Sequence, residues 1–370
     1  MLTLCQCLPA EDVVVLAPWG TGFRAQDSFN VKDRQAARNV DQKLEFKVHR
    51  SWYSARSKLQ TGFSILVFCT RTLWLVLREK PALVYFSHPY PTALIGLVLR
   101  LLGRPYVVHT HGNELFRPRM FVTDWLRRLV MQKAFRVVCT SNWTKDFVCG
   151  LGVNPDAAVV INPKLDLAKF HIPADIDSFK QREGLKGKHV LLSVGHIIHA
   201  KGQHLVIEAL PEIICQFPDT VYVVAGTGPD VERLKRLASE RGVEEHVVFP
   251  GNRDITSFYH ACDIFILPSL YESFGIVYIE ASACGKPVVG SKSGGIPDAV
   301  ADGESGLLIE TGNVKAIQDA LIKLLEVREL RERLGRQGYE RVQRYFTLDR
   351  LKDELRQLIL EPLERERQGS

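Results

Sequence analysis

Two series of short apolar segments constrain the fold of this 370-residue chain more than any other feature. Each segment is rich in β-branched residues, and a stretch with helical spacing follows it. The first series occupies residues 12–18, 80–87, 104–111, 135–141 and 157–163. The second series follows residue 187 and reads HVLLSVG, TVYVVAG, HVVFPG, DIFILPS, KPVVGS and GLLIE. Because apolar strands that alternate with helices are typical of parallel sheets covered on both faces, we predict an α/β fold.

The two series predict two Rossmann-like domains that face a cleft, with ligands at the carboxyl ends of the strands. A polar stretch at residues 165–188 carries charges, a proline and two glycines, and we interpret it as a linker. The predicted N-terminal domain covers residues 1–170, and the predicted C-terminal domain covers residues 171–346. Residues 347–370 are predicted to form a helix that crosses back toward the N-terminal domain.

The net charge is unevenly distributed along the chain. The first 165 residues hold 22 Lys and Arg against 11 Asp and Glu, and the remainder holds 26 against 31. A basic half favours an anionic partner, which is a membrane surface, a phosphorylated lipid or nucleic acid, with an ordinary solvated surface as the alternative. Residues 116–136 mix basic side chains with Phe, Met and Trp, which suits an anionic membrane or else a packed helix with a solvated face. No nucleic-acid partner is expected, because no reader motif or aromatic platform is present.

The cysteines and the hydropathy of the chain indicate the cellular compartment in which the protein works. The eight cysteines form no CxxC pair, and several lie inside apolar runs, so we interpret them as reduced core residues. No apolar run reaches the roughly 20 residues that a membrane helix needs. We therefore expect a cytoplasmic protein with peripheral contact to the inner face of the membrane.

The loop after HVLLSVG places a lysine at the start of a helix. Gly195 ends the predicted strand, and Lys201-Gly202 precedes an amphipathic stretch. A lysine at a helix start is unfavourable beside the helix dipole unless an anion binds there, so we predict a phosphate; a solvated lysine is the alternative. The next loop, VVAGTGPD, holds only half of a dinucleotide fingerprint, which argues against a nicotinamide cofactor.

The stretch YESFGIVYIE follows the predicted strand DIFILPS. Residues 273–276 are predicted to turn into a helix, which would leave the N–H groups of Gly275 and Ile276 as an anion cradle. Glu272 lies before this helix and Glu280 lies inside it. Because a carboxylate accepts two hydrogen bonds at once, these residues suit sugar hydroxyls and a ribose diol.

A fourth loop, SKSGGIPDAVADGESG, predicts a glycine-rich turn into a helix with an early proline. Together the four loops resemble the nucleotide-sugar domain of retaining glycosyltransferases of family four, which have the two-domain GT-B fold. In the N-terminal half, THGNE, CTSNWTKD and INPKLDLAKF agree in order and spacing. The resemblance spans about residues 12–360. The stretches FGIVYIEASACGKPVVG and KGQHLVIEALPEI are most similar to mannosyltransferases that use GDP-mannose, including those acting on phosphatidylinositol mannosides.

The resemblance implies transfer of a hexose, with mannose from GDP-mannose favoured, to a lipid-linked or glycan hydroxyl. It implies retention of configuration, no metal and no cofactor besides the nucleotide sugar. Lys201 would bind the diphosphate, Glu280 the ribose, and Glu272 the donor sugar. His111 would reach the transferred sugar from the other domain. The other implied donor-site residues are Gly195, His196, Gly251, Asn252, Arg253, Phe274, Gly275 and Ile276.

Two departures from the family pattern matter. His196 stands where relatives usually have an arginine, so we hypothesise that activity rises as the pH falls toward 6. Only 11 residues precede Asp12, too few for the strand, Gly-rich loop and helix with which the family opens. We therefore expect the first strand and its loop to be missing, which would affect acceptor binding. A UDP-sugar donor and a non-catalytic nucleotide-sugar-binding protein are the alternatives.

Overall fold

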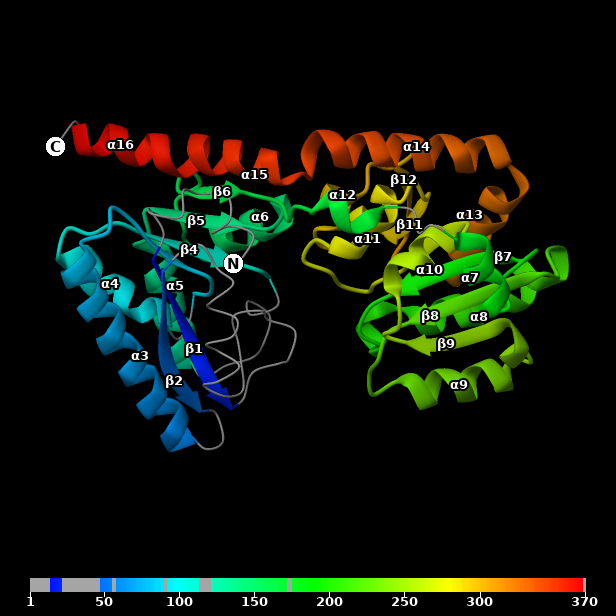
Figure 1. The fold of residues 1–370 in the computed structure, drawn as a ribbon, viewed down its shortest axis with the longest axis horizontal. Helices are drawn as coiled ribbons and strands as arrows, with labels where there is room; N and C mark the ends of the chain where they lie inside the picture. Colours follow the sequence, from blue (N-terminus) through cyan, green and yellow to red (C-terminus); the bar gives the residue numbers. More distant parts are fainter. Residues whose placement is uncertain are drawn as a thin grey trace. The chain divides into compact units, whose positions relative to one another are not determined.

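The computed structural model describes residues 14–21, 47–54, 58–89, 92–112, 121–171 and 175–368. The chain forms two compact units, shown as ribbons in Figure 1. Unit 1 comprises the residues up to Thr140, Thr144–Ile161 and the segment from Leu351 onward. Unit 2 comprises Ser141–Trp143 and Asn162–Arg350. Each unit has its own parallel strands and its own apolar core, so the predicted α/β class is confirmed.

Within its described residues, unit 1 has a two-stranded and a four-stranded parallel sheet. The first pairs β1 (Val14–Thr21) with β2 (Lys47–Ser54). The second has the order of its strands along the chain: β3 (Val84–Phe86), β4 (Tyr106–Thr110), β5 (Arg136–Cys139) and β6 (Ala158–Val160). The sequence predicts all of these except β2, whose segment KVHRSWYS interrupts its apolar residues with charged ones. The expected absence of a first strand and Gly-rich loop concerns residues outside the described ranges.

Helices cover the four-stranded sheet of unit 1. They are α3 (Lys58–Glu79), η2 (Thr92–Leu94), α4 (Ile95–Leu101), α5 (Phe121–Gln132) and α6 (Asn142–Gly150). Tyr106, at the start of β4, is buried and donates its hydroxyl hydrogen to the carbonyl of Val130 in α5 at 2.7 Å. A Cβ added at Gly96 would lie 2.8 Å from the Tyr106 ring, so glycine allows α4 to lie directly on this side chain.

The C-terminal segment completes the core of unit 1. It consists of α15 (Leu348–Leu355), the π-helical segment η6 (Arg356–Leu360) and α16 (Glu361–Gln368). Four of its apolar residues recur every four positions and are buried against the sheet: Leu351, Leu355, Ile359 and Leu363. A spacing of four drifts around an ordinary helix of 3.6 residues per turn, and the wider π turn compensates for that drift. The apolar stripe therefore keeps facing the same strands.

Unit 2 is a six-stranded parallel sheet of order β12-β11-β10-β7-β8-β9. Its strands are β7 (His189–Val194), β8 (Thr220–Ala225), β9 (Val247–Gly251), β10 (Ile264–Leu267), β11 (Val288–Ser291) and β12 (Gly306–Ile309). All six segments of the predicted second series are strands. Successive residues face opposite cores, because Leu192 and Phe265 belong to one cluster whereas Leu191 and Ile266 belong to the other.

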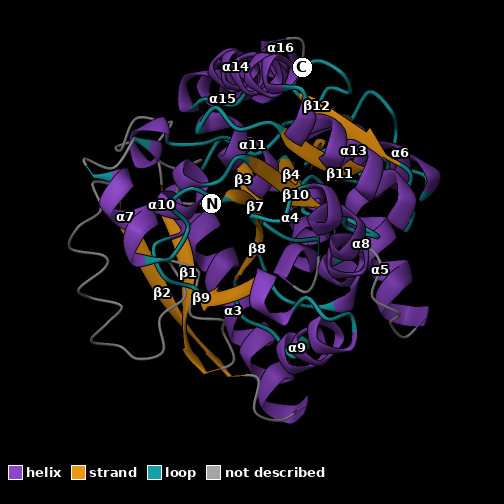
Figure 2. Ribbon diagram, turned by 90° about the vertical axis from the view of Figure 1, so that its right-hand side faces the viewer, coloured by secondary structure: helices purple, strands orange, loops and turns teal. Residues whose placement is uncertain are grey.

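Helices enclose both faces of this sheet (Figure 2). They are η3 (Leu167–Phe170), α7 (Ile176–Arg182), η4 (His199–Lys201), α8 (Gln203–Gln216), α9 (Val231–Glu240), η5 (Glu244–His246), α10 (Ile255–Ala261), α11 (Ile276–Ala283), α12 (Ile296–Ala299), α13 (Val314–Glu326) and α14 (Arg328–Tyr345). The interpretation of residues 165–188 as a linker is wrong. Phe179 of α7 and Leu185 are buried in the core of unit 2, and only the exposed face of the segment is polar.

Candidate active site

The strand order of unit 2 changes direction between β7 and β10. From β7 the sheet continues through β8 to β9 on one side, and from β10 through β11 to β12 on the other. In an open α/β sheet, ligands bind at such a switch point, outside the carboxyl ends of the strands. The loops after β7 and β10 carry Lys201 and Glu272, so topology brings the two main predicted residues to the same edge.

Main-chain contacts hold the loop after β7 against the loop after β10. The N–H group of Leu270 donates to the carbonyl of Ala200 at 2.9 Å. Gly202 has a φ of 71°, and a Cβ there would overlap the carbonyl oxygen of Pro268. Only a residue without a side chain permits this approach, which fixes the position of the neighbouring Lys201.

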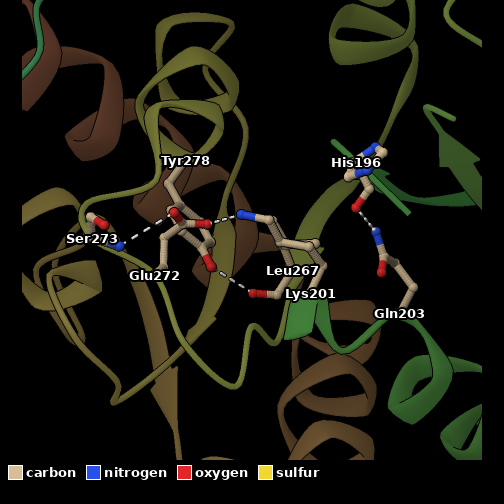
Figure 3. Close-up of polar contacts among 7 residues, drawn as sticks. All are labelled: His196, Lys201, Gln203, Leu267, Glu272, Ser273 and Tyr278. Carbon is tan, nitrogen blue, oxygen red and sulfur yellow. Dashed lines mark hydrogen bonds and ion pairs between the residues drawn. The ribbon is translucent and has the colours of Figure 1, made fainter. Parts of the chain in front are cut away.

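Lys201 and Glu272 form an ion pair, drawn in Figure 3. The ammonium group donates to Oε2 of Glu272, and Oε1 accepts the N–H of Ser273 at 3.3 Å. The side chains are 22% and 12% exposed, so both charges have lost much of their water. The pairing offsets that desolvation cost. An anion that reached Lys201 would compete with Glu272 for the ammonium group.

The fourth predicted loop encloses the main chain of Glu272. The N–H of Gly295 donates to the Glu272 carbonyl at 2.9 Å. A Cβ at Gly294 would overlap that carbonyl oxygen, and a Cβ at Gly295 would overlap the carbonyl oxygen of Ser273. The Gly294-Gly295 pair therefore fixes the main chain of Glu272 and, with it, the position of the Glu272 carboxylate. The predicted helix with an early proline is confirmed as α12, with Pro297 in its first turn.

Helix α11 begins at Ile276, four residues after Glu272. Its N-cap, Gly275, has a φ of 87°, and a Cβ there would overlap the ring of Tyr278. The hydroxyl of Tyr278 donates to the carbonyl of Leu267 at 2.6 Å, which ties the helix to the end of β10 (Figure 3). The first N–H groups of an α-helix have no intrahelical acceptor, and this helix starts in the loop at the carboxyl end of β10, where the predicted donors Gly275 and Ile276 lie. The helix ends at Ala283.

Glu280 lies in the second turn of α11 and pairs with a tyrosine. The hydroxyl of Tyr259, in α10, donates to Oε2 of Glu280 at 2.7 Å. Burial raises the pKa of Glu280, and the hydrogen bond from Tyr259 opposes that rise. Burial, together with the charge of Glu280, raises the pKa of Tyr259 well above its ordinary value. The raised pKa of Tyr259 keeps its hydroxyl protonated, so Tyr259 is the donor and Glu280 the acceptor of this hydrogen bond.

His196 is exposed and follows Gly195 at the end of β7. Its Nδ1 lies 2.7 Å from the carbonyl oxygen of Thr227. Because a carbonyl oxygen only accepts hydrogen bonds, Nδ1 carries the hydrogen and donates, and Nε2 of the neutral ring is an acceptor. Gln203, a buried residue at the start of α8, donates to the carbonyl of His196 at 3.4 Å (Figure 3).

The side chains of Phe274 and Ile276 have opposite environments. Phe274 is 2% exposed, and its ring packs edge-on against Phe346 with ring centroids 5.7 Å apart. Ile276 is 45% exposed at the first position of α11. Phe274 therefore anchors the loop in the core, and any ligand contact it makes would come from its main chain.

Gly251 is the last residue of the edge strand β9, and Asn252 and Arg253 follow it, so these three residues do not belong to the loops after β7 and β10. Arg253 donates to the carbonyl of Pro250 at 3.1 Å and to Oε2 of Glu183 at 3.2 Å. The structure thus gives the guanidinium group partners outside the Lys201 and Glu272 loops. A role for these three residues near a nucleotide base stays a prediction.

His111 belongs to unit 1, where it lies in a cluster of three imidazoles. Its ring centroid is 4.2 Å from that of His109 and 5.2 Å from that of His88. Nδ1 of His109 is hydrogen-bonded to the hydroxyl of Tyr85 at 2.9 Å. Burial, followed by the charge of His111, lowers the pKa of His109 well below its ordinary value. The sequence predicts His111 alone, and its role toward a sugar stays a prediction.

Neither a metal site nor a membrane span is found in the part of the chain that the structure describes. Within those ranges, no three His, Cys, Asp or Glu side chains are grouped so that they could hold a metal ion. None of the described helices combines the length and the apolar composition needed to cross a bilayer. Of the described cysteines, Cys139 and Cys262 are buried free thiols, whereas Cys215 is exposed.

Comparison with known proteins decides the family. The family described as "Glycosyl transferase 4-like domain" matches residues 1–164, and "Glycosyl transferases group 1" matches residues 175–341. A GDP-mannose-dependent alpha-(1-6)-phosphatidylinositol monomannoside mannosyltransferase of Mycobacterium tuberculosis is 30% identical over 282 residues, covering 72% of this chain and 73% of the relative. The chain belongs to the GT-B glycosyltransferases.

Other relatives and solved structures agree with this GT-B assignment. The protein of the same name from Mycolicibacterium smegmatis is 35% identical over 65% of this chain, and the match spans 66% of that relative, slightly under two thirds. A D-inositol 3-phosphate glycosyltransferase of Corynebacterium glutamicum is 29% identical, covering 78% of this chain and 75% of the relative. The structure of HepE from Anabaena has a TM-score of 0.78 at 20% identity, with coverages of 95% and 99%. WaaG has a TM-score of 0.67 at 18% identity, with coverages of 92% and 99%.

Sequence reasoning misses Tyr259, the partner of Glu280. The two residues lie 21 positions apart on different helices of this glycosyltransferase. Neither spacing nor composition links them, because Tyr259 sits within an ordinary apolar helix, ITSFYHA. Only the packing of α10 beside α11 brings the hydroxyl to the carboxylate.

Replacing Glu280 with glutamine is expected to raise the free energy of unfolding at pH 7.5. Burial raises the pKa of Glu280 above its ordinary value of 4.5, so the charged form is disfavoured in the folded state. Below that value both states are protonated, and the two proteins should be equally stable. The advantage of the variant should grow as the pH rises through the unfolded pKa and level off above the folded one. Chemical denaturation between pH 3.5 and 7.5 measures this difference.

Glu232→Gln is the matched control for this measurement. The hydrogen bond and charge of Lys235 lower the pKa of Glu232, so its carboxylate stabilises the folded state above the unfolded pKa. The control should therefore lose stability as the pH rises, the opposite sign to Glu280→Gln. A Glu280→Gln protein that is less stable than the parent at pH 7.5 would contradict the assigned effect of burial.

Proposed function

We propose that this chain is a retaining hexosyltransferase that moves mannose from GDP-mannose to a hydroxyl of a lipid-linked or glycan acceptor, without a metal or cofactor. The observation that carries the proposal is the meeting of Lys201, Glu272 and the first turn of α11 at the switch point. An ammonium group and free amides suit a diphosphate, and an adjacent carboxylate suits sugar hydroxyls. The names of the mycobacterial relatives support GDP-mannose as the donor.

The proposed reaction breaks the bond between the anomeric carbon and the diphosphate oxygen. The bonding electron pair leaves with the diphosphate, and the acceptor oxygen bonds to the anomeric carbon on the same face. The proton of the acceptor hydroxyl goes to a phosphate oxygen of the leaving group. Lys201 and the α11 amides would stabilise the developing charge, and one such group can lower a barrier by about 3 kcal/mol. Glu280 would hold the ribose, and His111 would contact the transferred sugar.

The ion pair provides a way to couple the two halves of the donor. In the described structure Lys201 is already occupied by Glu272. A bound diphosphate would replace the carboxylate as the partner of Lys201, which frees oxygens of Glu272 to accept hydrogen bonds from the sugar. Diphosphate binding would then prepare the carboxylate for the sugar without any movement of the main chain.

Two alternatives remain open to experiment. The first is a UDP-sugar donor of the glucose or N-acetylglucosamine type; HepE, which shares the fold, was solved with UDP and with UDP and glucose. The second is a nucleotide-sugar-binding protein without transferase activity. Release of GDP and free mannose from GDP-mannose would favour the enzyme over the binding protein, since slow donor hydrolysis needs the same stabilised leaving group.

GDP is expected to stabilise the protein against thermal unfolding, whereas ADP is not. A ligand at 100 times its dissociation constant adds about 2.7 kcal/mol to the stability of the native state. Glu280→Ala and Lys201→Ala should each remove most of this shift, because they delete the proposed ribose and diphosphate contacts. Differential scanning fluorimetry with GDP, UDP and ADP measures all cases.

Lys235→Ala is the control for the loss of a lysine, because Lys235 is an exposed residue of α9 paired with Glu232. It should keep the full shift. A shift with UDP in place of GDP would move the donor to a UDP-sugar. No shift with any nucleotide would contradict the proposed donor site, and a shift that survives both Glu280→Ala and Lys201→Ala would place the nucleotide elsewhere.

Diphosphate affinity is expected to rise as the pH falls from 8 to 6. Nδ1 of His196 donates to Thr227, so in the neutral ring Nε2 carries a lone pair and no hydrogen. Protonation would convert Nε2 into a donor for the diphosphate. His196→Ala should flatten the change, and His196→Arg should bind tightly at both pH values. Titration calorimetry with GDP at pH 6, 7 and 8 tests this, and equal slopes for the parent and His196→Ala would refute it.

We also propose peripheral contact with an anionic membrane at the cytoplasmic face, through unit 1. On α5, Trp125 is 55% exposed and Arg128 is exposed beside it. Arg127 does not contribute, because it is 4% exposed and pairs with Asp124 at 3.2 Å. The predicted basic surface of this helix is therefore smaller than its sequence indicates.

A larger apolar surface lies on α3. Phe63, Leu66, Trp74 and Leu77 are each about half exposed or more, and their spacing places them on one face of the helix. The guanidinium of Arg78 lies over the Trp74 ring, 5.1 Å from its centroid. Residues 58–104 hold six Lys and Arg and one acidic residue, Glu79. Apolar side chains flanked by cations suit an anionic lipid surface.

Vesicle binding distinguishes the two helices. The protein should sediment with phosphatidylcholine vesicles that contain phosphatidylglycerol and, at raised salt, bind them more weakly. Trp74→Ser with Leu77→Ser should weaken binding by about tenfold or more, since each buried apolar side chain contributes about 1.5–3 kcal/mol. Trp125→Ser is the matched control on α5. A loss confined to Trp125→Ser would place the contact on α5, and absence of binding would contradict the membrane proposal.

A further inference from the structure

The side chain of Tyr259, which donates a hydrogen bond to Glu280, is held in place by the packing of its ring. The side chain is 1% exposed, and its ring packs against Phe265 and Phe170, with centroids 5.8 and 6.5 Å away. A buried ring between aromatic neighbours keeps a single rotamer, so the hydroxyl has one position. That position is 2.7 Å from Oε2 of Glu280.

Glu280 itself is only partly buried, and it belongs to the second turn of α11. An ionised carboxylate only accepts hydrogen bonds, so the phenol of Tyr259 is the donor. With Oε2 held by the phenol, rotation of the carboxylate about its last bond is restrained. The other oxygen, Oε1, is then presented in a constant direction.

We infer that Tyr259 is a positioning residue for the ribose diol of the nucleotide donor, acting by holding the carboxylate of Glu280. The inference rests on the proposed role of Glu280 and goes beyond it, because it assigns ribose recognition to a pair rather than to one residue. It also explains why the partner is a neutral phenol. A cation would neutralise the charge of the carboxylate, as Lys201 does for Glu272. A neutral phenol does not, so the carboxylate keeps its full charge for hydrogen bonds from two ribose hydroxyls.

Among the residues that the structure describes, no cation contributes to the pKa shift of Glu280, which follows from burial and the hydrogen bond from Tyr259. The thiols of Cys262 and Cys284 interact with Tyr259, and burial raises the pKa of each to about 12, so both are neutral at pH 7. Lys286 acts on these thiols and donates to the carbonyl of His260 at 2.8 Å. The hydrogen bond from Tyr259 is therefore the interaction that favours the charged form of Glu280.

The test compares a ribonucleotide with its deoxy counterpart. Titration calorimetry with GDP and 2′-deoxy-GDP on the full chain gives the ratio of their dissociation constants, which reports the ribose contact alone. We expect a ratio of about ten for the parent, as for one hydrogen bond to a charged group. Tyr259→Phe should lower the ratio to about three, and Glu280→Ala should lower it to about one. If UDP is the nucleotide bound, the same comparison uses UDP and 2′-deoxy-UDP.

Tyr222→Phe is the matched control. Tyr222 is also a fully buried tyrosine of unit 2, and its hydroxyl is hydrogen-bonded to Oγ of Ser193 at the same distance, 2.7 Å. It lies in the other core cluster, on β8. The variant therefore loses a comparable buried hydrogen bond without touching Glu280, and its ratio should equal that of the parent.

Glu280→Gln provides a second test that does not need Tyr259→Phe to fold. A phenol that holds the amide oxygen forces the NH2 group toward the ribose, so the ratio should fall to about one. Combining Glu280→Gln with Tyr259→Phe frees the amide to turn, and part of the discrimination should return. A merely structural tyrosine would give no such recovery.

The outcomes separate the inference from the proposed function. A parent-like ratio in Tyr259→Phe, or a Glu280→Gln ratio that the second substitution does not raise, would overturn the positioning role alone. A parent-like ratio in Glu280→Ala would instead overturn the proposed ribose contact. No binding of GDP or UDP by the parent protein would contradict both.

Discussion

The site depends on main chains that approach one another more closely than a side chain would allow. Gly202 lies against the carbonyl of Pro268, and the Gly294-Gly295 pair lies against the carbonyls of Glu272 and Ser273. Each contact joins two loops that follow different strands of one sheet. The loops therefore form a single packed layer at the carboxyl edge, and the side chains they carry inherit fixed positions. A methyl group at any of these glycines would separate the loops before it touched a ligand.

The same layer presents two carboxylates in different electrostatic states. Glu272 is paired with a full positive charge from Lys201, so it is neutralised until an anion takes that lysine. Within the described part of the chain, Glu280 is held by the phenol of Tyr259, so burial disfavours its charged form and no cation neutralises it there. The ion pair suits Glu272 if this carboxylate is to be released when the diphosphate binds Lys201. The hydrogen bond from Tyr259 suits Glu280 if this carboxylate is to be oriented for the ribose before the nucleotide binds.

Most of the strands and the turns of the candidate site could be predicted from the sequence, because they depend on residues that are close together along the chain. Apolar runs predict eleven of the described strands, and Gly202 beside Lys201 and Gly275 three residues after Glu272 mark turns with a positive φ that favours glycine. What the sequence could not show is long-range. The ion pair of Lys201 and Glu272 spans 71 positions, and the partner of Glu280 lies on another helix. The burial of Phe179 within a polar segment was likewise invisible, since a single aromatic residue does not change the local composition.

The two units carry different parts of the proposed reaction. The ion pair of Lys201 with Glu272 and the hydrogen bond of Tyr259 to Glu280 both lie within Asn162–Arg350, so the proposed nucleotide site belongs to unit 2. His111 and the surfaces proposed for the membrane belong to unit 1. Donor binding and sugar transfer can therefore fail independently. A protein that binds the nucleotide but transfers no sugar would direct attention to unit 1, whereas loss of nucleotide binding would direct it to the three packed loops after β7, β10 and β11.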